Sequence, residues 1–502
     1  MDLKVLSNRG YVIKKQNLEL KEINKIKNEL TVKPITFGDY NQNIKPFKLY
    51  KENENKLYLP KSYGIKMFNE PDFNYLNQNA VKVKLRFNGV LRDNQKPVID
   101  AFMNATQKTV GGGIVCVGCG FGKTILSLYI LSLLGYKTLV IVHKEFLAYQ
   151  WIERINEFLP EARIGKIQQN VIDIEDKEIV IGMLQSISMK DYEKTVFESF
   201  GFVILDECHH LGAEVFSKAL PKITTQYMLG LSATPDRKDG LRRVFEYYLG
   251  DMVFCIKGRE PEKVLVKLVE YNCLDENYKQ EFHNFKGTII VPKMISQLCE
   301  DPVRLQIIIN YLKILVVEGR KILILSERRE HLSNIKKIID NLEIGSSGFY
   351  VGGSKQEVLK ESESKQIILG TFQMASEGMD IASLNTVILS TPKSDIEQSV
   401  GRILREKKEN RNFTPLIIDI IDQPKNFKRQ AMIRKKFYKS NNYIIETEKY
   451  LGSELSQKKP PPKEISIDFE QMTINDFQIT NENKTETESE IKQPINFNEC
   501  LL

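Results

Sequence analysis

Short runs of β-branched and other apolar residues alternate with longer amphipathic stretches between about Leu91 and Asp422. This alternation is typical of buried parallel strands that are each followed by a helix. The runs that we predict as buried strands are Gly113 to Val117, Thr138 to Val142, Glu178 to Ile181, Phe202 to Leu205, Tyr227 to Leu231, Lys321 to Leu325, Gln366 to Gly370, Thr386 to Leu389 and Leu416 to Ile420. The pattern therefore predicts an α/β protein with parallel sheets.

The predicted strands fall into two clusters. The first ends near Gly250, and the second begins between Gly258 and Asp301, after a connector with strand-like pieces such as Val264 to Tyr271. A chain of 502 residues exceeds the usual size of one domain, and no repeat of fixed period is visible. We therefore predict two tandem α/β lobes, the first over residues 86–252 and the second, with its connector, over residues 253–450.

The two ends of the chain differ from this core in composition. Residues 1–85 are rich in Lys and Asn and show helical spacing over Leu18 to Leu30, which predicts a small N-terminal accessory domain. Residues 451–502 hold ten acidic residues against five lysines and contain a run of three prolines, which predicts a disordered acidic tail. Since the whole chain carries +7 and the tail −5, residues 1–450 carry +12.

Composition narrows the class of protein only a little. The excess of Lys and Arg, 72 against 65 Asp and Glu, permits a polyanionic partner without requiring one. No uninterrupted apolar stretch reaches the roughly 18 residues of a membrane span, and the first residues lack the apolar segment of a secretory signal, so we expect an intracellular protein. The only close cysteine pair, Cys116 and Cys119, has no second pair to complete a metal site, so we expect reduced thiols and no zinc.

A glycine-rich turn follows the predicted strand at Gly113 to Val117. Its residues are Gly118, Cys119, Gly120, Phe121 and Gly122, and Lys123 and Thr124 then open an apolar helix. Glycines let backbone N–H groups converge on phosphate oxygens, and the helix terminus adds positive potential. Lys123 would reach the outer phosphates, and Thr124 would offer its hydroxyl to Mg²⁺. The strict pattern has glycine where this chain has Val117, so an ordinary strand-to-helix turn is the alternative.

Two acidic residues follow the predicted strand at Phe202 to Leu205. Asp206 and Glu207 would stand at the carboxyl end of that strand, where open α/β sheets bind their ligands. Asp206 would hold the shell of a Mg²⁺ ion. Glu207 would orient and deprotonate an attacking water, since phosphoryl transfer depends chiefly on positioning and charge neutralisation. The alternative is that both acidic residues lie in a solvent-exposed loop after a buried strand.

These residues resemble the ordered motifs of superfamily 2 helicases. Asp206-Glu207-Cys208-His209 is similar to the DExH box and Lys123-Thr124 to the phosphate loop, while Ser232-Ala233-Thr234 resembles the motif that couples the nucleotide to the nucleic-acid strand. Thr371 to Asp380 and Gln398 to Arg405 resemble two motifs of the second lobe, the latter as QxxGRxxR. All stand in family order over about Leu91 to Arg405, which implies two tandem RecA-like lobes.

The resemblance implies a role for each of these residues. Gly378, Asp380 and Gln398 would contact the nucleotide or link the lobes, Arg402 and Arg405 would act as fingers on the γ-phosphate, and His209, Ser232 and Thr234 would couple hydrolysis to movement. ATP is the expected substrate and Mg²⁺ the expected cofactor. If the fingers stand on one lobe and Lys123 on the other, hydrolysis is fast only when the cleft closes. The alternative for Arg402 and Arg405 is a helix with surface arginines at i and i+3.

Two further stretches narrow the resemblance. Leu91 to Gln95 resembles an LRxxQ element that reads adenine, with Gln95 on the base edge and Arg92 nearby. Ala233 to Gly240 is similar to the ATPxRxDG stretch of the branch that includes the xeroderma pigmentosum B and phage UvsW helicases, which are DNA translocases of transcription, repair and recombination. With its length and the NELTVKP stretch at Asn28 to Pro34, the chain most resembles helicases of large nucleocytoplasmic DNA viruses, including those of iridoviruses and the poxvirus transcript-release helicase.

Helicases of this family bind nucleic acid across both lobes, opposite the ATP cleft and through its phosphates. The candidates that the resemblance implies here are Lys144, Gln185, Arg328 and Thr371. Phosphate contacts do not read sequence, so we expect sequence-independent and salt-sensitive binding. An exposed surface charge is the alternative for each basic residue, and Trp151, the single tryptophan, is expected in the core.

In the tail, Gln471, Ile474 and Phe477 have the spacing of a sliding-clamp-binding peptide. One helical turn would place Ile474 and Phe477 on the same side, where they could insert into a groove of the clamp, and Gln471 would hydrogen-bond next to them. Gln478 stands where that pattern has its second aromatic residue, so a chance match in a polar tail is the alternative.

Together these features predict an ATP hydrolase that works as a helicase or translocase on nucleic acid, DNA rather than RNA, in viral transcription termination, repair or recombination. An RNA helicase is the first alternative, because the motifs contact the sugar-phosphate backbone and do not show which residue would recognise the 2′-hydroxyl of RNA. A non-catalytic scaffold with the same fold and a partner-recruiting tail is the second. If the protein is viral, its expected place is the virion or the host nucleus or cytoplasm.

Overall fold

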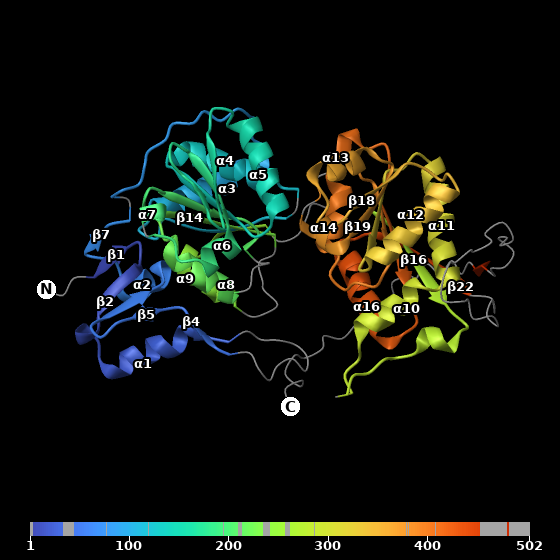
Figure 1. Ribbon diagram of the computed structural model, residues 1–502, viewed down its shortest axis with the longest axis horizontal. Helices are drawn as coiled ribbons and strands as arrows, with labels where there is room; N and C mark the ends of the chain where they lie inside the picture. The colour runs from blue at the N-terminus through green and yellow to red at the C-terminus, as the bar shows by residue number, and fades with distance from the viewer. Residues whose placement is uncertain are drawn as a thin grey trace.

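The chain folds into two α/β lobes and a smaller N-terminal unit that lies against the first lobe (Figure 1). The computed structural model describes residues 4–33, 45–76, 78–118, 120–193, 195–208, 213–233, 241–256, 262–285, 287–377, 379, 381–406, 408–451 and 479–480. The predicted fold class, α/β with parallel sheets in two lobes, is confirmed.

The first lobe is built on an eight-stranded sheet in the order β11-β10-β12-β9-β13-β14-β8-β15, in which every neighbouring pair is parallel except β10 and β11. The strands are β8 (Gly112–Cys116), β9 (Thr138–Val142), β10 (Ile164–Gln168), β11 (Val171–Asp173), β12 (Ile179–Met183), β13 (Phe202–Leu205), β14 (Tyr227–Ser232) and β15 (Met252–Cys255). The α-helices are α3 (Lys96–Thr106), α4 (Lys123–Leu134), α5 (Glu145–Phe158), α6 (Leu184–Met189), α7 (Thr195–Glu198), α8 (Ala213–Ala219) and α9 (Arg242–Leu249). Because β15 pairs with β8, this sheet extends to Cys255, beyond residue 252.

Both faces of this sheet are buried, which explains the continuous apolar runs in its strands. Alternate residues of β9 enter different cores, since side chains along a strand point to opposite faces. Leu139 and Ile141 pack in the core that α6 and α9 cover, whereas Val140 and Val142 pack in the core that α3, α4 and α5 cover.

The second lobe repeats this design with the strand order β18-β19-β17-β20-β21-β16-β22-β23, antiparallel only between β22 and β23. Its strands are β16 (Leu265–Asn272), β17 (Ile322–Ser326), β18 (Ser347–Tyr350), β19 (Ile367–Thr371), β20 (Thr386–Leu389), β21 (Leu416–Ile421), β22 (Ile444–Leu451) and β23 (Ile479–Thr480). Its α-helices are α10 (Val291–Cys299), α11 (Pro302–Val317), α12 (Arg329–Asn341), α13 (Gln356–Ser364), α14 (Phe372–Glu377), α15 (Glu397–Val400) and α16 (Lys425–Ser440). The stretch that we expected in a connector, Val264 to Tyr271, instead forms β16 inside this sheet, because both of its edges pair with neighbouring strands.

The N-terminal unit has a five-stranded sheet in the order β5-β6-β2-β1-β7. The strands of this sheet are β1 (Val5–Ser7), β2 (Gly10–Lys14), β5 (Lys51–Glu52), β6 (Lys56–Leu59) and β7 (Phe73–Asn74). Beside it lie α1 (Leu20–Glu29), α2 (Lys61–Phe68) and a small pair of strands, β3 (Thr31–Val32) and β4 (Phe47–Lys48). The helical spacing over Leu18 to Leu30 thus appears as α1.

Buried contacts attach this N-terminal unit to the first lobe. The Lys61 ammonium is fully buried and donates to the carbonyl oxygens of Thr225 at 2.9 Å and Gln226 at 3.0 Å. Burial lowers the pKa of Lys61 to about 7. The Tyr248 hydroxyl donates to the Leu49 carbonyl oxygen at 2.8 Å, and one apolar cluster runs through both parts. The N-terminal unit and the first lobe therefore form one packed body.

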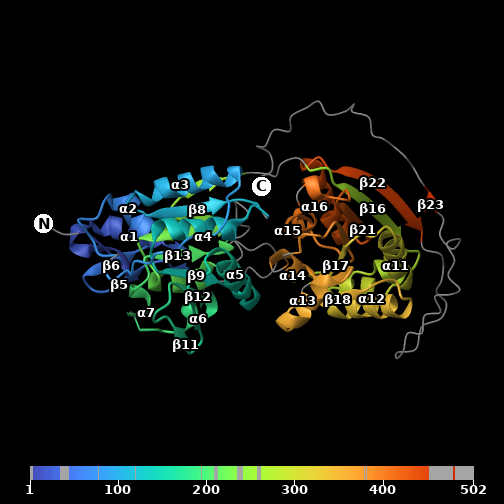
Figure 2. The same cartoon turned by 90° about the horizontal axis from the view of Figure 1, so that it is seen from above.

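The two lobes meet through α5 and α13. Glu153 Oε1 on α5 lies 2.6 Å from Lys360 Nζ on α13, and both side chains are about half exposed. Phe146, at the start of α5, packs against the cores of both lobes. Figure 2 shows α14 and α15 on the side of the second lobe that faces the first. An exposed ion pair contributes little free energy, so these contacts are compatible with movement of the lobes.

Candidate active site

The glycine turn and the acidic residues meet at one edge of the first sheet. β8, β14 and β13 are adjacent and parallel, so their carboxyl ends lie side by side. The glycine turn follows β8, Ser232 ends β14 and is 3% exposed, and Asp206 follows β13. Residues that are far apart in the sequence thereby line one site.

The glycine turn leaves open space where a phosphate would lie. A Cβ added to Gly118 or Gly120 would meet no atom within 4 Å, and Gly120 and Gly122 have φ angles of +80° and +88°. L side chains rarely adopt such angles, so glycine suits both positions. Gly122 is the N-cap of α4, and Lys123 and Thr124 are its first two residues. A turn that opens onto a helix N-terminus fits a phosphate group.

Gln95 and Arg92 hydrogen-bond to backbone carbonyl oxygens of this turn. Gln95 is 2% exposed, and its Nε2 donates to the Phe121 carbonyl oxygen at 2.9 Å. Arg92 donates to the Gly120 carbonyl oxygen at 3.2 Å. A Cβ on Gly122 would lie 2.6 Å from Gln95 Nε2, so the glycine also makes room for this contact. Both residues therefore lie at the loop, and their reading of adenine stays a prediction.

Lys123 forms an ion pair with Glu207. Lys123 Nζ donates to Glu207 Oε1 at 2.8 Å, and their side chains are only 10% and 17% exposed. Glu207 has a φ angle of +47°, which is uncommon outside glycine and indicates a backbone held in place by its surroundings. The strand β13 therefore delivers this carboxylate directly to the phosphate-loop lysine.

Asp206 is buried beside this pair. It is 7% exposed, and the Trp151 indole Nε1 donates to its Oδ2 at 2.8 Å. Burial, with the neighbouring Glu207 charge, raises the pKa of Asp206 to about 6, although Lys123 and the Trp151 hydrogen bond oppose the shift. A buried carboxylate next to a second acid fits a divalent cation, and oxygen donors suit Mg²⁺. Asp206 and Thr124 are the residues that would hold it.

Trp151 is a residue of this site that the sequence analysis assigned only to the core. It is 1% exposed, as expected, yet its N–H is the hydrogen-bond donor to Asp206. The indole N–H of a buried Trp usually donates to a nearby acceptor. The sequence could therefore indicate that Trp151 needs an acceptor, but not that the acceptor is Asp206.

The predicted arginine fingers lie in and after the 3₁₀ turn Gly401–Leu404, which follows α15. The Arg402 guanidinium is 5% exposed and donates to the carbonyl oxygens of Ala375 at 2.5 Å, Met379 at 2.7 Å and Ser376. Arg402 is thus buried inside its own lobe, at the end of α14, and is not a solvated surface residue. Arg405 is partly buried, and Gln398 lies on α15. The roles of these three residues at the nucleotide stay predictions.

The candidate nucleic-acid residues follow adjacent strands in each lobe. Lys144 and Gln185 come after β9 and β12, and Arg328 and Thr371 come at the ends of β17 and β19. Gln185 Nε2 donates to the His143 carbonyl oxygen at 2.8 Å. Arg328 donates to Ser296 Oγ at 3.1 Å and to the Pro292 carbonyl oxygen at 2.6 Å, so part of its guanidinium holds α10. Their contact with nucleic acid stays a prediction.

Several predicted site residues lie outside the described residues. They are Cys119, His209, Thr234, Gly378, Asp380, Gln471, Ile474 and Phe477. Within the described part of the chain, no group of three His, Cys, Asp or Glu side chains could hold a metal ion, and no helix is long and apolar enough to cross a membrane.

Two family descriptions match the chain. "Type III restriction enzyme, res subunit" matches residues 88–237, and "Helicase conserved C-terminal domain" matches residues 304–407. The first region carries the glycine turn and the acidic residues, and the second carries Arg402 and Arg405. The two matches define a two-lobed helicase.

Proteins of large DNA viruses are similar over most of the chain. The "Putative ATP-dependent RNA helicase" of Acanthamoeba polyphaga mimivirus is 36% identical over 460 residues, which cover 89% of this chain and 87% of that protein. A protein of the same description from African swine fever virus is 27% identical over 381 residues, 70% of this chain and 73% of that protein. The chain therefore belongs to the superfamily 2 helicases, in a family with these viral proteins, and it is an ATP-dependent helicase.

A solved structure resembles the chain in fold. A fragment of a type I restriction enzyme HsdR subunit from Vibrio vulnificus has a TM-score of 0.50 at 16% identity, covering 73% of this chain and 70% of that one. The phage T4 UvsW structure covers 86% of this chain and 96% of its own, with a TM-score of 0.34 at 18% identity.

Proposed function

We propose that the chain hydrolyses ATP between its lobes and uses the energy to move along nucleic acid, DNA rather than RNA. The observation that carries this proposal is the ion pair of Lys123 with Glu207, beside a glycine turn that is open to a phosphate. Lysine, two carboxylates and open backbone are the groups that phosphoryl transfer needs.

Lys123 would exchange Glu207 for the outer phosphates when nucleotide binds. The released Glu207 carboxylate would then accept a proton from the attacking water. That water forms a bond to the γ-phosphorus, and the bond from this phosphorus to the β–γ bridging oxygen breaks, so ADP leaves. Bound Mg²⁺ would neutralise charge on the phosphate oxygens.

Closure of the lobes would couple this reaction to movement. The contact of α5 with α13 is small and exposed, so it can break and re-form at a modest free-energy cost. Arg405 on the second lobe would then reach the γ-phosphate only in the closed state. Arg402 would have to leave three carbonyl oxygens to do so, which favours Arg405 as the finger.

An RNA substrate is the second candidate, because the mimivirus and African swine fever virus relatives are named as RNA helicases. The DNA assignment rests on the ATPxRxDG stretch at Ala233 to Gly240. The process would be viral transcription termination, repair or recombination, and the location intracellular. Clamp binding through Gln471, Ile474 and Phe477 stays a proposal, which capture by a sliding clamp would test with Phe477→Ala.

The test compares ATP hydrolysis by the wild-type chain with single-stranded DNA, duplex DNA and RNA present, and strand displacement on DNA and RNA with 3′ or 5′ tails. We expect stimulation by DNA above that by RNA, loss of hydrolysis in Lys123→Ala, and ATP that binds without turnover in Glu207→Gln. Stronger stimulation by RNA would favour the second candidate. Full biological function of Lys123→Ala would instead support a non-catalytic scaffold.

A further inference from the structure

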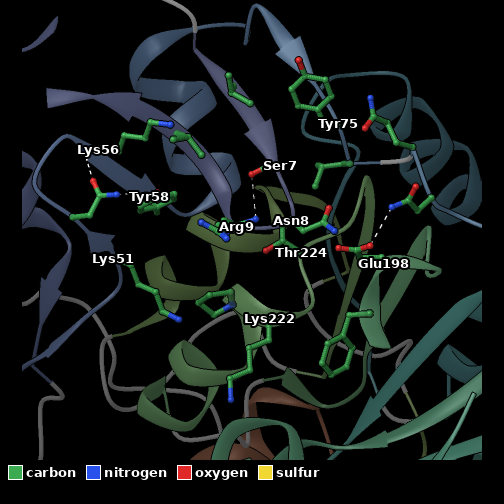
Figure 3. A pocket seen from close by; sticks show the side chains of 18 of the residues that line it. Ser7, Asn8, Arg9, Lys51, Lys56, Tyr58, Tyr75, Glu198, Lys222 and Thr224 are labelled. Carbon is green, nitrogen blue, oxygen red and sulfur yellow. Dashed lines mark hydrogen bonds between the residues drawn. The ribbon is translucent and has the colours of Figure 1, made fainter. Parts of the chain in front are cut away.

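A large groove lies between the N-terminal unit and the first lobe (Figure 3), and no residue of the phosphate loop lines it. Its volume is about 1110 Å³. One wall comes from the N-terminal sheet, with Arg9 in the turn between β1 and β2, Lys51 on β5 and Tyr58 on β6. The other wall comes from α7 and the turn near Thr224. This volume lies just above the upper end of the range of about 300 to 1000 Å³ that is usual for a small-ligand site, so the groove has room for a segment of a polymer.

The groove keeps its shape because its two walls belong to one packed body. The Lys61 ammonium and the Tyr248 hydroxyl join the walls through buried hydrogen bonds. Asn74 Nδ2 on the N-terminal side also donates to Gln226 Oε1 on the first lobe at 2.8 Å. A ligand in this groove would move with the first lobe when the second lobe opens or closes.

Three basic side chains in the groove have no carboxylate partner among the described residues. They are Arg9, Lys51 and Lys56, and all three are exposed.

The carboxylates of the groove are already engaged by other groups. Glu52 pairs with Lys15 at 2.6 Å and with Lys27 at 2.9 Å, Asp191 pairs with Lys222 at 3.1 Å, and Glu198 accepts from Asn79 at 3.1 Å. Glu52 and Asp191 are therefore paired with lysines, whereas Glu198 keeps its negative charge. The lining still holds five basic side chains against three acidic ones, and this excess of positive charge favours a polyanion.

Two aromatic side chains, Tyr58 and Tyr75, line the same groove. The Arg9 guanidinium carbon is 5.9 Å from the centre of the Tyr58 ring, and Tyr75 is 40% exposed and stacks on Phe73 at 6.0 Å with an interplanar angle of 9°. An exposed ring that is held by a second ring offers a flat face for a base. Cations that track phosphates together with aromatic faces are the combination that binds single strands.

We infer that this groove binds a single strand of nucleic acid, with its phosphates at Arg9, Lys51 and Lys56 and a base on Tyr75. The inference rests on the proposed function and adds a second contact with the strand, outside the two lobes' own motifs. A strand fixed here stays attached to the first lobe throughout the cycle, so the second lobe would move relative to it.

The test measures binding of the full chain to oligo-dT and oligo-rU of roughly 12 nucleotides, as a function of salt. The variant Arg9→Ala/Lys51→Ala/Lys56→Ala removes the three cations. Each phosphate contact contributes about 0.7 to the slope of log K against log salt, so we expect the slope to fall by about 2. A matched control, Lys21→Ala/Lys25→Ala/Lys313→Ala, removes three exposed lysines outside the groove and should keep the slope.

A second variant separates stacking from charge. Tyr75→Ala should weaken binding about 5- to 150-fold at constant salt, the usual effect of losing one stacked base. The control is Phe285→Ala, which removes an exposed ring elsewhere. Thermal melting establishes that each variant is folded, and hydrolysis without nucleic acid should equal that of the wild type. The dT and rU arms show which sugar the groove prefers.

Unchanged slope and affinity in both groove variants, with wild-type stimulation of hydrolysis by nucleic acid, would overturn the inference and leave the proposed function intact. If no nucleic acid stimulates the wild-type chain, the proposed function itself fails. Equal losses in the groove and control variants would show a general effect of net charge and would also overturn the inference.

Discussion

The indole N–H of Trp151 donates to Asp206 Oδ2 at 2.8 Å, between residues that are 55 positions apart. This bond orients the buried carboxylate that would hold Mg²⁺, and it does so from α5, the helix that also contacts the second lobe. The helix α5 therefore carries both Glu153, which contacts the second lobe, and Trp151, which holds Asp206 in place.

Trp151→Phe should raise the Mg²⁺ concentration for half-maximal ATP hydrolysis by roughly 10-fold, the usual effect of losing a hydrogen bond behind a metal ligand. The phenyl ring keeps most of the packing, so the melting temperature should change little. Hydrolysis is measured in a Mg²⁺ titration. Tyr149→Phe, on the exposed side of the same helix, is the control. The same Mg²⁺ requirement in both variants would show that the indole bond does not support the metal site.

Arg405→Ala should lower turnover by about 10³-fold or more and change the KM for ATP much less, because a finger acts mainly on the transition state. Steady-state hydrolysis with saturating nucleic acid gives both constants. Arg429→Ala, which removes an exposed arginine from α16, serves for comparison and should be active. Near-normal turnover of the Arg405 variant would exclude it as the finger.

Arg304→Met should destabilise the second lobe by about 3 to 5 kcal/mol, since it leaves Asp422 as an uncompensated buried charge. Arg304 Nε donates to Asp422 Oδ1 at 2.7 Å, and both side chains are at most 1% exposed. Denaturant unfolding measures the change. The double variant Arg304→Met/Asp422→Leu should recover much of the loss, because no charge then stays buried. A double variant as unstable as the single one would contradict this account.

Acid should destabilise the second lobe partly through His331. This residue is 2% exposed, its Nδ1 lies 3.2 Å from Ser326 Oγ, and burial, with the nearby Arg304 charge, lowers its pKa to about 3. The folded state thus stays neutral at His331 while the unfolded state gains a proton below about 6.5. This contribution to stability is complete above pH 6.5 and is lost as the pH falls toward 3.

His331→Leu should therefore reduce the slope of the free energy of unfolding against pH by about 1.4 kcal/mol per pH unit between pH 6 and 4. Unfolding in urea at a series of pH values measures it. His283→Gln, at a half-exposed histidine, is the control and should keep the wild-type slope. An unchanged slope in the His331 variant would show that its burial does not set the acid response.

The central strands of both sheets and the acidic and glycine-rich stretches could be predicted from the sequence because they depend on local order, whereas the strands at the sheet margins, such as β10 and β18, were not predicted. A buried strand needs a continuous apolar run, and polar residues directly after parallel strands must come to one edge of the sheet. The sequence alone therefore predicts that Lys123, Asp206 and Glu207 lie at one edge of the sheet. The stretch Val264 to Tyr271 does form a strand, but in the sheet of the second lobe and not in a connector, because a single apolar run does not show with which strands it pairs.

Contacts between distant segments were decided only by the tertiary structure. No local pattern indicates that Trp151 faces Asp206, that Arg402 donates to three carbonyl oxygens of its own lobe, or that Lys61 is buried under the first lobe. Such contacts arise when complete elements pack, and their energies come from burial and from the need to satisfy buried polar groups. The sequence by itself therefore determined which chemical groups the protein carries and on which strands, whereas the packing of those elements decided which groups meet.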